Sequence, residues 1–118
     1  MKKKFSEEVK KYLGKKVWIK VDRPINSLHP RYNFVYEVNY GFVPKTKAPD
    51  NEEIDAYILK VKEPVNSYEG ICVAIIHRKD DDDDKLIIVP EQYLNISDEE
   101  IMDNIFFQEK WFDHVLIR

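Results

Sequence analysis

Short apolar segments separated by turn residues dominate the chain and limit the folds that it can adopt. In the first segment Val17, Ile19 and Val21 alternate with Trp18 and with charged residues, which is the period of a strand with one buried face. Pro24 then ends that strand. Similar segments, each expected to be a strand, lie at residues 34–40, 54–61, 71–77 and 85–89, with a last short one at 114–118.

Two helices are expected beside these strands. In residues 5–13, Ser6 is a plausible N-cap and Gly14 follows the last turn. Ser97 opens a capping box with the acidic residues behind it, which predicts a helix that continues to about residue 112. Five main strands with flanking helices predict a mainly β fold of the α+β class, a small closed or partly closed β-barrel with helical cover.

The length of the chain sets the scale of the molecule. Its 118 residues form one domain, 1–118, whose core is small enough that a homo-oligomer would be no surprise. The only cysteine, Cys72, excludes an internal disulfide and a cysteine-based zinc site. Because the chain shows neither a secretory leader nor a membrane-spanning segment, we expect a cytoplasmic protein with no membrane partner.

Charge is distributed unevenly along the chain. Residues 1–33 carry ten Lys and Arg against three Asp and Glu, whereas residues 50–84 carry eleven acidic against four basic residues. A basic segment beside an acidic one suits a ligand that combines metal cations with phosphate. An ordinary solvated surface is the alternative, and charge alone favours it.

The first acidic cluster reads Asp50-Asn51-Glu52-Glu53-Ile54-Asp55. Carboxylates this close repel one another unless a cation lies between them. Hard oxygen donors without cysteine or a paired-histidine motif favour Mg²⁺, Mn²⁺ or Ca²⁺ over zinc. The cluster lacks the glycine and the closing glutamate of an EF-hand. A plain acidic turn is the alternative.

The second acidic cluster is a run of five aspartates, residues 80–84, that leads directly into a strand at Lys85. In an extended segment Asp83 and Lys85 point to the same face, which would place a metal ligand beside a phosphate-binding cation. A disordered acidic loop is the alternative, and composition alone favours it.

The third cluster is the segment Tyr36-Glu37-Val38-Asn39-Tyr40-Gly41-Phe42. Tyr36 and Tyr40 share one face of an expected strand, where their hydroxyl groups could donate to phosphate oxygens or simply cap core aromatics. The three histidines, His29, His77 and His114, have no ligand spacing and are expected to be structural.

These three clusters, in this order, resemble the soluble family I inorganic pyrophosphatases. The segment around Tyr40 is similar to the family motif Y-P-x-N-Y-G-Y, the segment ending at Asp55 to D-G-D-P-x-D, and the residues ending at Lys85 to D-x-K. The likeness runs from about Val17 to Val89 and is closest to short bacterial pyrophosphatase-like proteins. It implies an OB-like five-stranded β-barrel.

The resemblance also implies a chemistry. Pyrophosphate would be split into two phosphates by a metal-activated water, with two or more Mg²⁺ ions, or Mn²⁺, as cofactors and without a phosphoenzyme. Glu52 would be the general base. The metal ligands would be Asp50, Asp55 and Asp83, with Asp80 or Asp81 on another ion, and the phosphate ligands would be Lys85, Tyr40, Tyr36 and Arg31.

The chain departs from the family pattern at several positions. Glu37 replaces a proline, Asn51 a glycine, and Glu52 the aspartate of the water-binding position. An early Lys-x-Glu segment has no counterpart, and Lys110-Trp111 stands where the family has Tyr-Lys. The rivals are therefore a hydrolase of another small phosphoanhydride or phosphoester, and a catalytically weak metal-binding barrel. A nucleic-acid partner is not expected, because the acidic clusters would oppose it.

Overall fold

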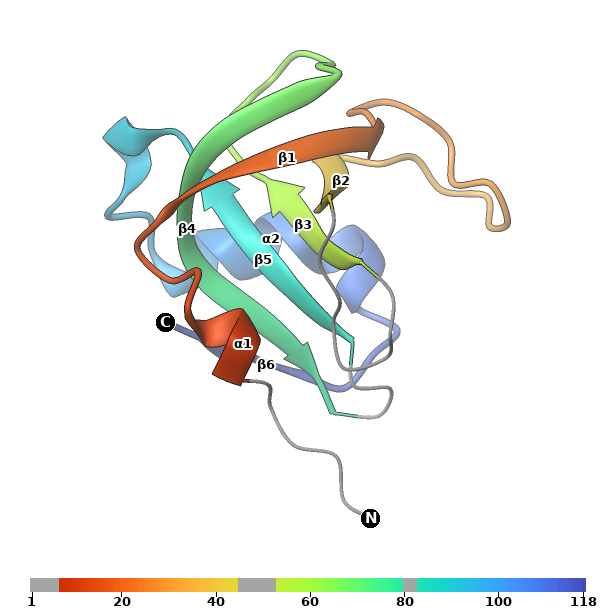
Figure 1. Ribbon diagram of the computed structural model, residues 1–118. Helices are drawn as coiled ribbons and strands as arrows, with labels where there is room; N and C mark the ends of the chain where they lie inside the picture. The colour runs from red at the N-terminus through yellow and green to blue at the C-terminus, as the bar shows by residue number, and fades with distance from the viewer. Residues whose placement is uncertain (1–6, 45–52, 80–82) are drawn as a thin grey trace.

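Val17, Ile19 and Val21 of the first strand face the interior of a closed β-barrel (Figure 1). The structure is a computed structural model that describes residues 7–44, 53–79 and 83–118. The barrel strands are β1 (Lys16–Arg23), β2 (Asn39–Val43), β3 (Ile54–Ile58), β4 (Ser67–Arg78) and β5 (Asp84–Val89). The other elements are α1 (Glu7–Lys10), the 3-10 turn η1 (Glu91–Tyr93), α2 (Asp98–Glu109) and β6 (His114–Ile117).

Strand pairing closes the barrel and confirms the predicted mainly β fold. The strands are hydrogen-bonded in the order β1-β2-β3-β5-β4, and β1 also pairs with β4, so the sheet returns to its first strand. β3 and β5 are parallel, whereas the other pairs are antiparallel. The twelve-residue β4 is long enough to pair with β1 near its start and with β6 near its end. The expected last strand is therefore present as β6.

The barrel wall separates two apolar cores. One fills the barrel with side chains from all five strands, together with Val9 of α1. The second lies on the outer face of the sheet, where Tyr57, Ile76 and Ile87 pack against Ile101 and other residues of α2. Because successive residues of a strand point to opposite faces, β2, β3, β4 and β5 supply both cores, whereas β1 supplies only the inner one and exposes its other face.

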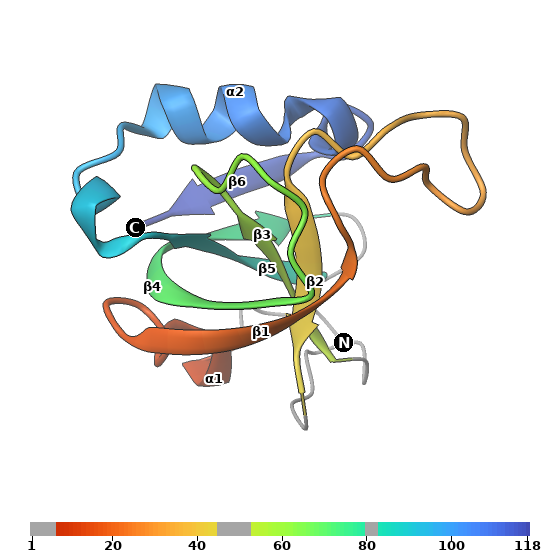
Figure 2. The same ribbon diagram turned by 90° about the horizontal axis from the view of Figure 1, so that it is seen from above.

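Helix α2 lies across one side of the barrel, with α1 on the other side (Figure 2). As predicted, Ser97 is its N-cap, and the Ser97 side chain accepts a hydrogen bond from the backbone N–H of Glu100 at 3.1 Å. The helix ends at Glu109, before the expected residue 112. Within the described part of the chain, no helix has the length and apolarity needed to cross a bilayer.

Three strands have a boundary that differs from the prediction by three residues or more. The strand expected at residues 54–61 ends at Ile58. Residues 34–38 alternate as expected, yet the backbone of Tyr36 bonds to Asn26 and Ser27 of the preceding loop, so β2 begins only at Asn39. Conversely, β4 begins at Ser67, inside a predicted connection, because its exposed polar residues pair with β1. Residues 5–13 were expected to be a helix, but within the described residues α1 covers only Glu7–Lys10.

We expect Gly41→Ala to destabilise the fold by about 3 kcal/mol, because overpacking against backbone cannot be relieved by a rotamer change. A Cβ at Gly41 would lie 2.0 Å from the Lys20 carbonyl oxygen, where β2 crosses close to β1. Urea denaturation followed by circular dichroism measures the loss.

Gly14→Ala is the matched control. Gly14 has φ +80° and no heavy atom within 4 Å of an added Cβ, so this change adds only backbone strain, about 1 kcal/mol. Equal losses of stability in the two variants would show that the close approach of β1 and β2 is not the reason for a glycine at position 41.

Candidate functional site

The parallel pairing of β3 with β5 brings the predicted site residues together. Parallel strands begin at the same edge of a sheet, and Asp55 lies opposite Lys85 in the register. The Lys85 ammonium donates to Asp55 Oδ2 and to Asp83 Oδ2, both at 3.0 Å. The prediction that Asp83 and Lys85 share a face is therefore confirmed, and Asp55 joins them from the neighbouring strand.

The Tyr40 hydroxyl completes this cluster of four side chains. It accepts a hydrogen bond from the Lys85 ammonium at 2.6 Å and donates one to Asp55 Oδ2 at 2.9 Å. Burial raises the pKa of Tyr40 well above its ordinary value, and the charges of Asp55 and Asp83 raise it further. The hydroxyl therefore stays protonated at neutral pH and acts as a hydrogen-bond donor.

Lys85 is almost fully buried, yet it remains a cation. Burial acts to lower the pKa of its ammonium, but the carboxylates of Asp55 and Asp83 outweigh burial, and the pKa is raised above its ordinary value. A permanently charged ammonium binds anions and does not serve as a general base.

A buried ion pair, not identified from the sequence, supports the cluster from the α2 side. The Arg78 guanidinium forms two hydrogen bonds with Glu109, from Nε to Oε1 at 3.0 Å and from Nη2 to Oε2 at 2.8 Å. Its Nη1 lies 3.5 Å from Asp83 Oδ2, and its face covers the Phe112 ring at 3.6 Å. Arg78 therefore links the C-terminal end of α2 to the carboxylate cluster.

Glu109 could have been found from helical spacing. Ile101, Ile105 and Glu109 follow one another at intervals of four residues, so the acid lies on the buried face of α2. A fully buried carboxylate requires partners. Besides Arg78, it accepts a hydrogen bond from the Tyr57 hydroxyl at 2.5 Å.

Gln108 extends this buried network to Tyr36. Its Nε2 donates to the Tyr57 hydroxyl at 2.7 Å, and its Oε1 accepts from the Tyr36 hydroxyl at 3.0 Å. Burial also raises the pKa of Tyr36 above its ordinary value. Tyr36 stacks on Tyr40 with ring centroids 5.4 Å apart, so it supports the cluster from the side.

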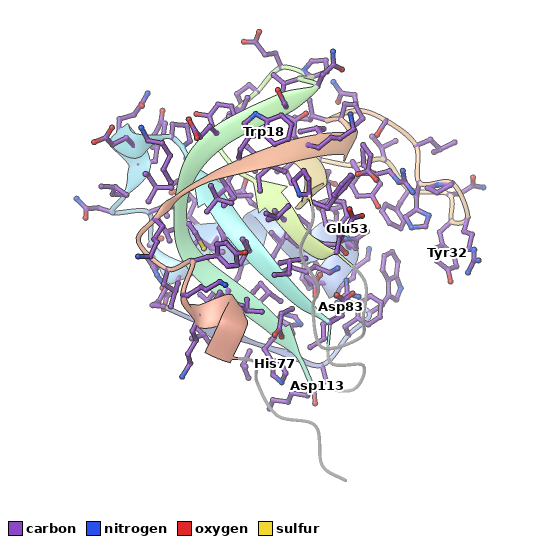
Figure 3. The ribbon with its side chains drawn as sticks, in the orientation of Figure 1. Trp18, Tyr32, Glu53, His77, Asp83 and Asp113 are labelled. Atoms are coloured by element: carbon purple, nitrogen blue, oxygen red, sulfur yellow. The ribbon has the colours of Figure 1, made fainter. Side chains whose placement is uncertain are left out.

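A cavity of about 800 Å³ opens over these groups. Its lining combines the cluster of Tyr40, Asp55, Asp83 and Lys85 with charged residues and with aromatic residues of the 24–38 loop and the end of α2. In Figure 3, Asp83 marks the cluster beside the start of β3, and Tyr32 marks the loop that projects from the barrel. The remaining lining residues are Asp22, Arg23, His29, Tyr32, Asn33, Phe34, Tyr36, Arg78, Gln108, Lys110, Trp111 and Phe112.

Not every residue expected at the site lies in this lining. The side chain of Arg31 is exposed, and Arg31 is not a lining residue, whereas Arg23 is one. Asp50, Glu52, Asp80 and Asp81 lie outside the described residues. His29 contributes to the lining, while His77 bonds to buried Asp84 with 2.6 Å between Nδ1 and Oδ1.

The cavity carries oxygen donors of the kind that hard divalent cations prefer. Asp22, Asp55 and Asp83 all contribute carboxylates to the lining. Burial raises the pKa of Asp22, Arg23 opposes the rise, and the negative charge of Asp55 adds to it, as expected for carboxylates that converge. Within residues 7–44, 53–79 and 83–118, no three acidic, histidine or cysteine side chains are placed closely enough to hold a metal by themselves.

Sequence comparison matches one family model to most of the chain. The family model described as "Pyrophosphatase: Inorganic pyrophosphatase" matches residues 3–115. No curated protein matches the chain.

Structure comparison finds the same fold in bacterial proteins at low identity. An inorganic pyrophosphatase from Ehrlichia chaffeensis is 17% identical, with a TM-score of 0.67 over 86% of this chain and 84% of that one. The Helicobacter pylori inorganic pyrophosphatase is also 17% identical, with a TM-score of 0.61 over 99% of this chain and 86% of that one. At this identity the likeness establishes the fold.

We expect Glu109→Gln to cost about 3 kcal/mol of stability, because it leaves the Arg78 charge buried without its carboxylate. Asp103→Asn is the control, since Asp103 is an exposed acid on the same helix and should change stability by less than about 0.5 kcal/mol. Urea denaturation measures both variants. A Glu109→Gln protein as stable as its parent would contradict a structural role for this ion pair.

Proposed function

Because this chain belongs to the inorganic pyrophosphatase family, we propose that it hydrolyses the phosphoanhydride bond of inorganic pyrophosphate to give two phosphates. The observation that supports this most strongly is the position of the Lys85 ammonium. It lies 3.0 Å from one oxygen of each of two carboxylates, inside a cavity at the edge where two parallel strands begin. Anion-binding and cation-binding groups thus adjoin each other, as a metal–phosphate complex requires.

The acidic groups of the site would hold Mg²⁺. Asp55 and Asp83 would share one ion with Asp50, and Asp80 or Asp81 would help to hold another. When bound, Mg²⁺ supplies two things, a lowered pKa for an attacking water and neutralisation of phosphate charge.

The basic and hydroxyl groups would hold the phosphates. Lys85 and Arg78 would donate charge-assisted hydrogen bonds to phosphate oxygens, and Tyr40 would donate from its hydroxyl. In the ligand-free protein Lys85 neutralises Asp55 and Asp83, so its ammonium is already placed for a phosphate once those carboxylates are neutralised otherwise. Glu52 would take the proton from the attacking water.

Phosphate release from pyrophosphate, measured with Mg²⁺ and with EDTA, tests the proposed reaction directly. We expect release that depends on Mg²⁺. If the protein binds pyrophosphate but releases no phosphate with Mg²⁺, the proposed activity is wrong, and the metal-binding barrel without this activity is the remaining interpretation.

We expect Asp55→Asn to abolish both phosphate release and the rise in melting temperature that Mg²⁺ causes in the parent protein. The change keeps the shape of the side chain but removes a charge on which the cation depends, and a ligand stabilises a fold only if the folded state binds it. Thermal melts with Mg²⁺ and with EDTA measure the second effect.

Asp113→Asn controls for the loss of one negative charge, because Asp113 is exposed and does not line the cavity. It should leave both the rate and the Mg²⁺ response unchanged. If Asp55→Asn also keeps both, the metal site lies elsewhere.

Lys85→Met should lower kcat/KM for pyrophosphate by roughly 10- to 150-fold, the range that corresponds to one hydrogen bond from a charged group. It should also destabilise the metal-free protein, since Asp55 and Asp83 then face each other without a cation. Added Mg²⁺ should restore part of that stability. A variant with normal turnover would show that Lys85 is only structural.

A further inference from the structure

The cavity has an aromatic wall that binding of pyrophosphate does not require. The wall consists of His29, Tyr32, Phe34 and Trp111. The His29 ring lies 5.0 Å from that of Tyr32 and 4.7 Å from that of Phe34, centroid to centroid, and Phe34 lies 5.3 Å from Trp111. All four residues line the same cavity as Asp55, Asp83 and Lys85.

Two members of the wall present their rings to solvent. Tyr32 is 61% exposed and Trp111 is 57% exposed. Packing of the 24–38 loop onto α2 accounts for Phe34, whose ring contacts Phe107 at 6.1 Å between centroids. That packing does not account for the Tyr32 and Trp111 rings, because more than half of each remains exposed. An exposed Trp and an exposed Tyr beside a cavity are typical of a binding surface.

The wall is continuous with the charged cluster. Phe34 lies 5.6 Å from Tyr36, and Tyr36 stacks on Tyr40, whose hydroxyl bonds to Lys85 and Asp55. A ligand whose phosphates occupy the cluster would therefore have its next groups beside the aromatic rings. Arg23 and Lys110 line the same cavity and add positive charge to it.

We propose that the cavity binds a nucleoside diphosphate or triphosphate, with the terminal phosphoanhydride at Asp55, Asp83 and Lys85 and the base stacked against Tyr32 and Trp111. This rests on the proposed phosphoanhydride hydrolysis and names a larger substrate for the same site. Pyrophosphate has no apolar surface with which to use the wall. A cavity of about 800 Å³ lies in the size range of pockets that enclose drug-sized ligands, and every nucleobase has a face that stacks on aromatic side chains.

The reaction balances as a hydrolysis. The water oxygen forms a bond to the terminal phosphorus, while the bond from that phosphorus to the bridging oxygen breaks. The electron pair of the broken bond stays with the shortened nucleotide. One proton of the water passes to the general base of the proposed mechanism and then to solvent. The products are inorganic phosphate and a nucleotide with one phosphate fewer.

The two tryptophans of the chain allow a direct binding test. Trp18 lies on β1, is 47% exposed and does not line the cavity, so Trp18→Phe leaves Trp111 as the only tryptophan (Figure 3). Titration with a methylene-bridged ADP analogue in the presence of Mg²⁺ should quench Trp111 fluorescence. The analogue should bind about tenfold or more tightly than methylenediphosphonate, which has the same P–C–P unit without the nucleoside. The reciprocal variant Trp111→Phe should show no quenching.

Steady-state kinetics give a second readout. Trp111→Ala and Tyr32→Ala should each lower the ratio of kcat/KM for ADP to kcat/KM for pyrophosphate by about tenfold. Trp18→Ala should leave that ratio, and both individual values, unchanged.

The outcomes separate this inference from the proposed function. Equal binding of the two analogues, or an unchanged ratio in both variants, would overturn the nucleotide inference, and Mg²⁺-dependent pyrophosphate hydrolysis could still stand. Base-dependent binding without pyrophosphate hydrolysis would support the nucleotide site and overturn the proposed function. If Trp111→Ala only converts a dimer into a monomer in gel filtration, the wall is an interface between copies of the chain, and the inference fails.

Discussion

The buried ammonium of Lys85 is the interaction on which the site depends. It neutralises the carboxylates of Asp55, on β3, and Asp83, directly before β5, which would otherwise repel each other. Its burial costs solvation, which those two carboxylates and the Tyr40 hydroxyl replace. The same arrangement that stabilises the ligand-free protein therefore keeps a cation and two acids together in one cavity.

A second buried ion pair anchors this cluster to the helix. Arg78 at the end of β4 and Glu109 at the end of α2 join the sheet to its cover through two hydrogen bonds. The buried face of α2 is thus apolar along most of its length but charged at the end nearest the cavity. The end of α2 therefore packs beneath the site, whereas the 24–38 loop and Trp111 form the more exposed part of the cavity lining.

Local periodicity predicted the fold well because five strands and α2 each bury a face. It placed Asp83 and Lys85 correctly, since the two-residue period is independent of the rest of the structure. It failed where pairing partners are distant or irregular. Tyr36 alternates like a strand residue but pairs with a loop, and the Arg78–Glu109 contact spans 31 residues. The proximity of Asp55 to Lys85 required the parallel pairing of β3 and β5, which no local pattern reveals.

Alternation along β5 has a consequence for how related chains can vary in length. Lys85 faces the site, while its neighbours Asp84 and Leu86 belong to the other side of the sheet. A slip of one residue would replace the ammonium by a carboxylate or a leucine, but pairing with both β3 and β4 holds the register. Insertions or deletions among the preceding aspartates would therefore change the number of acids and leave the lysine in place.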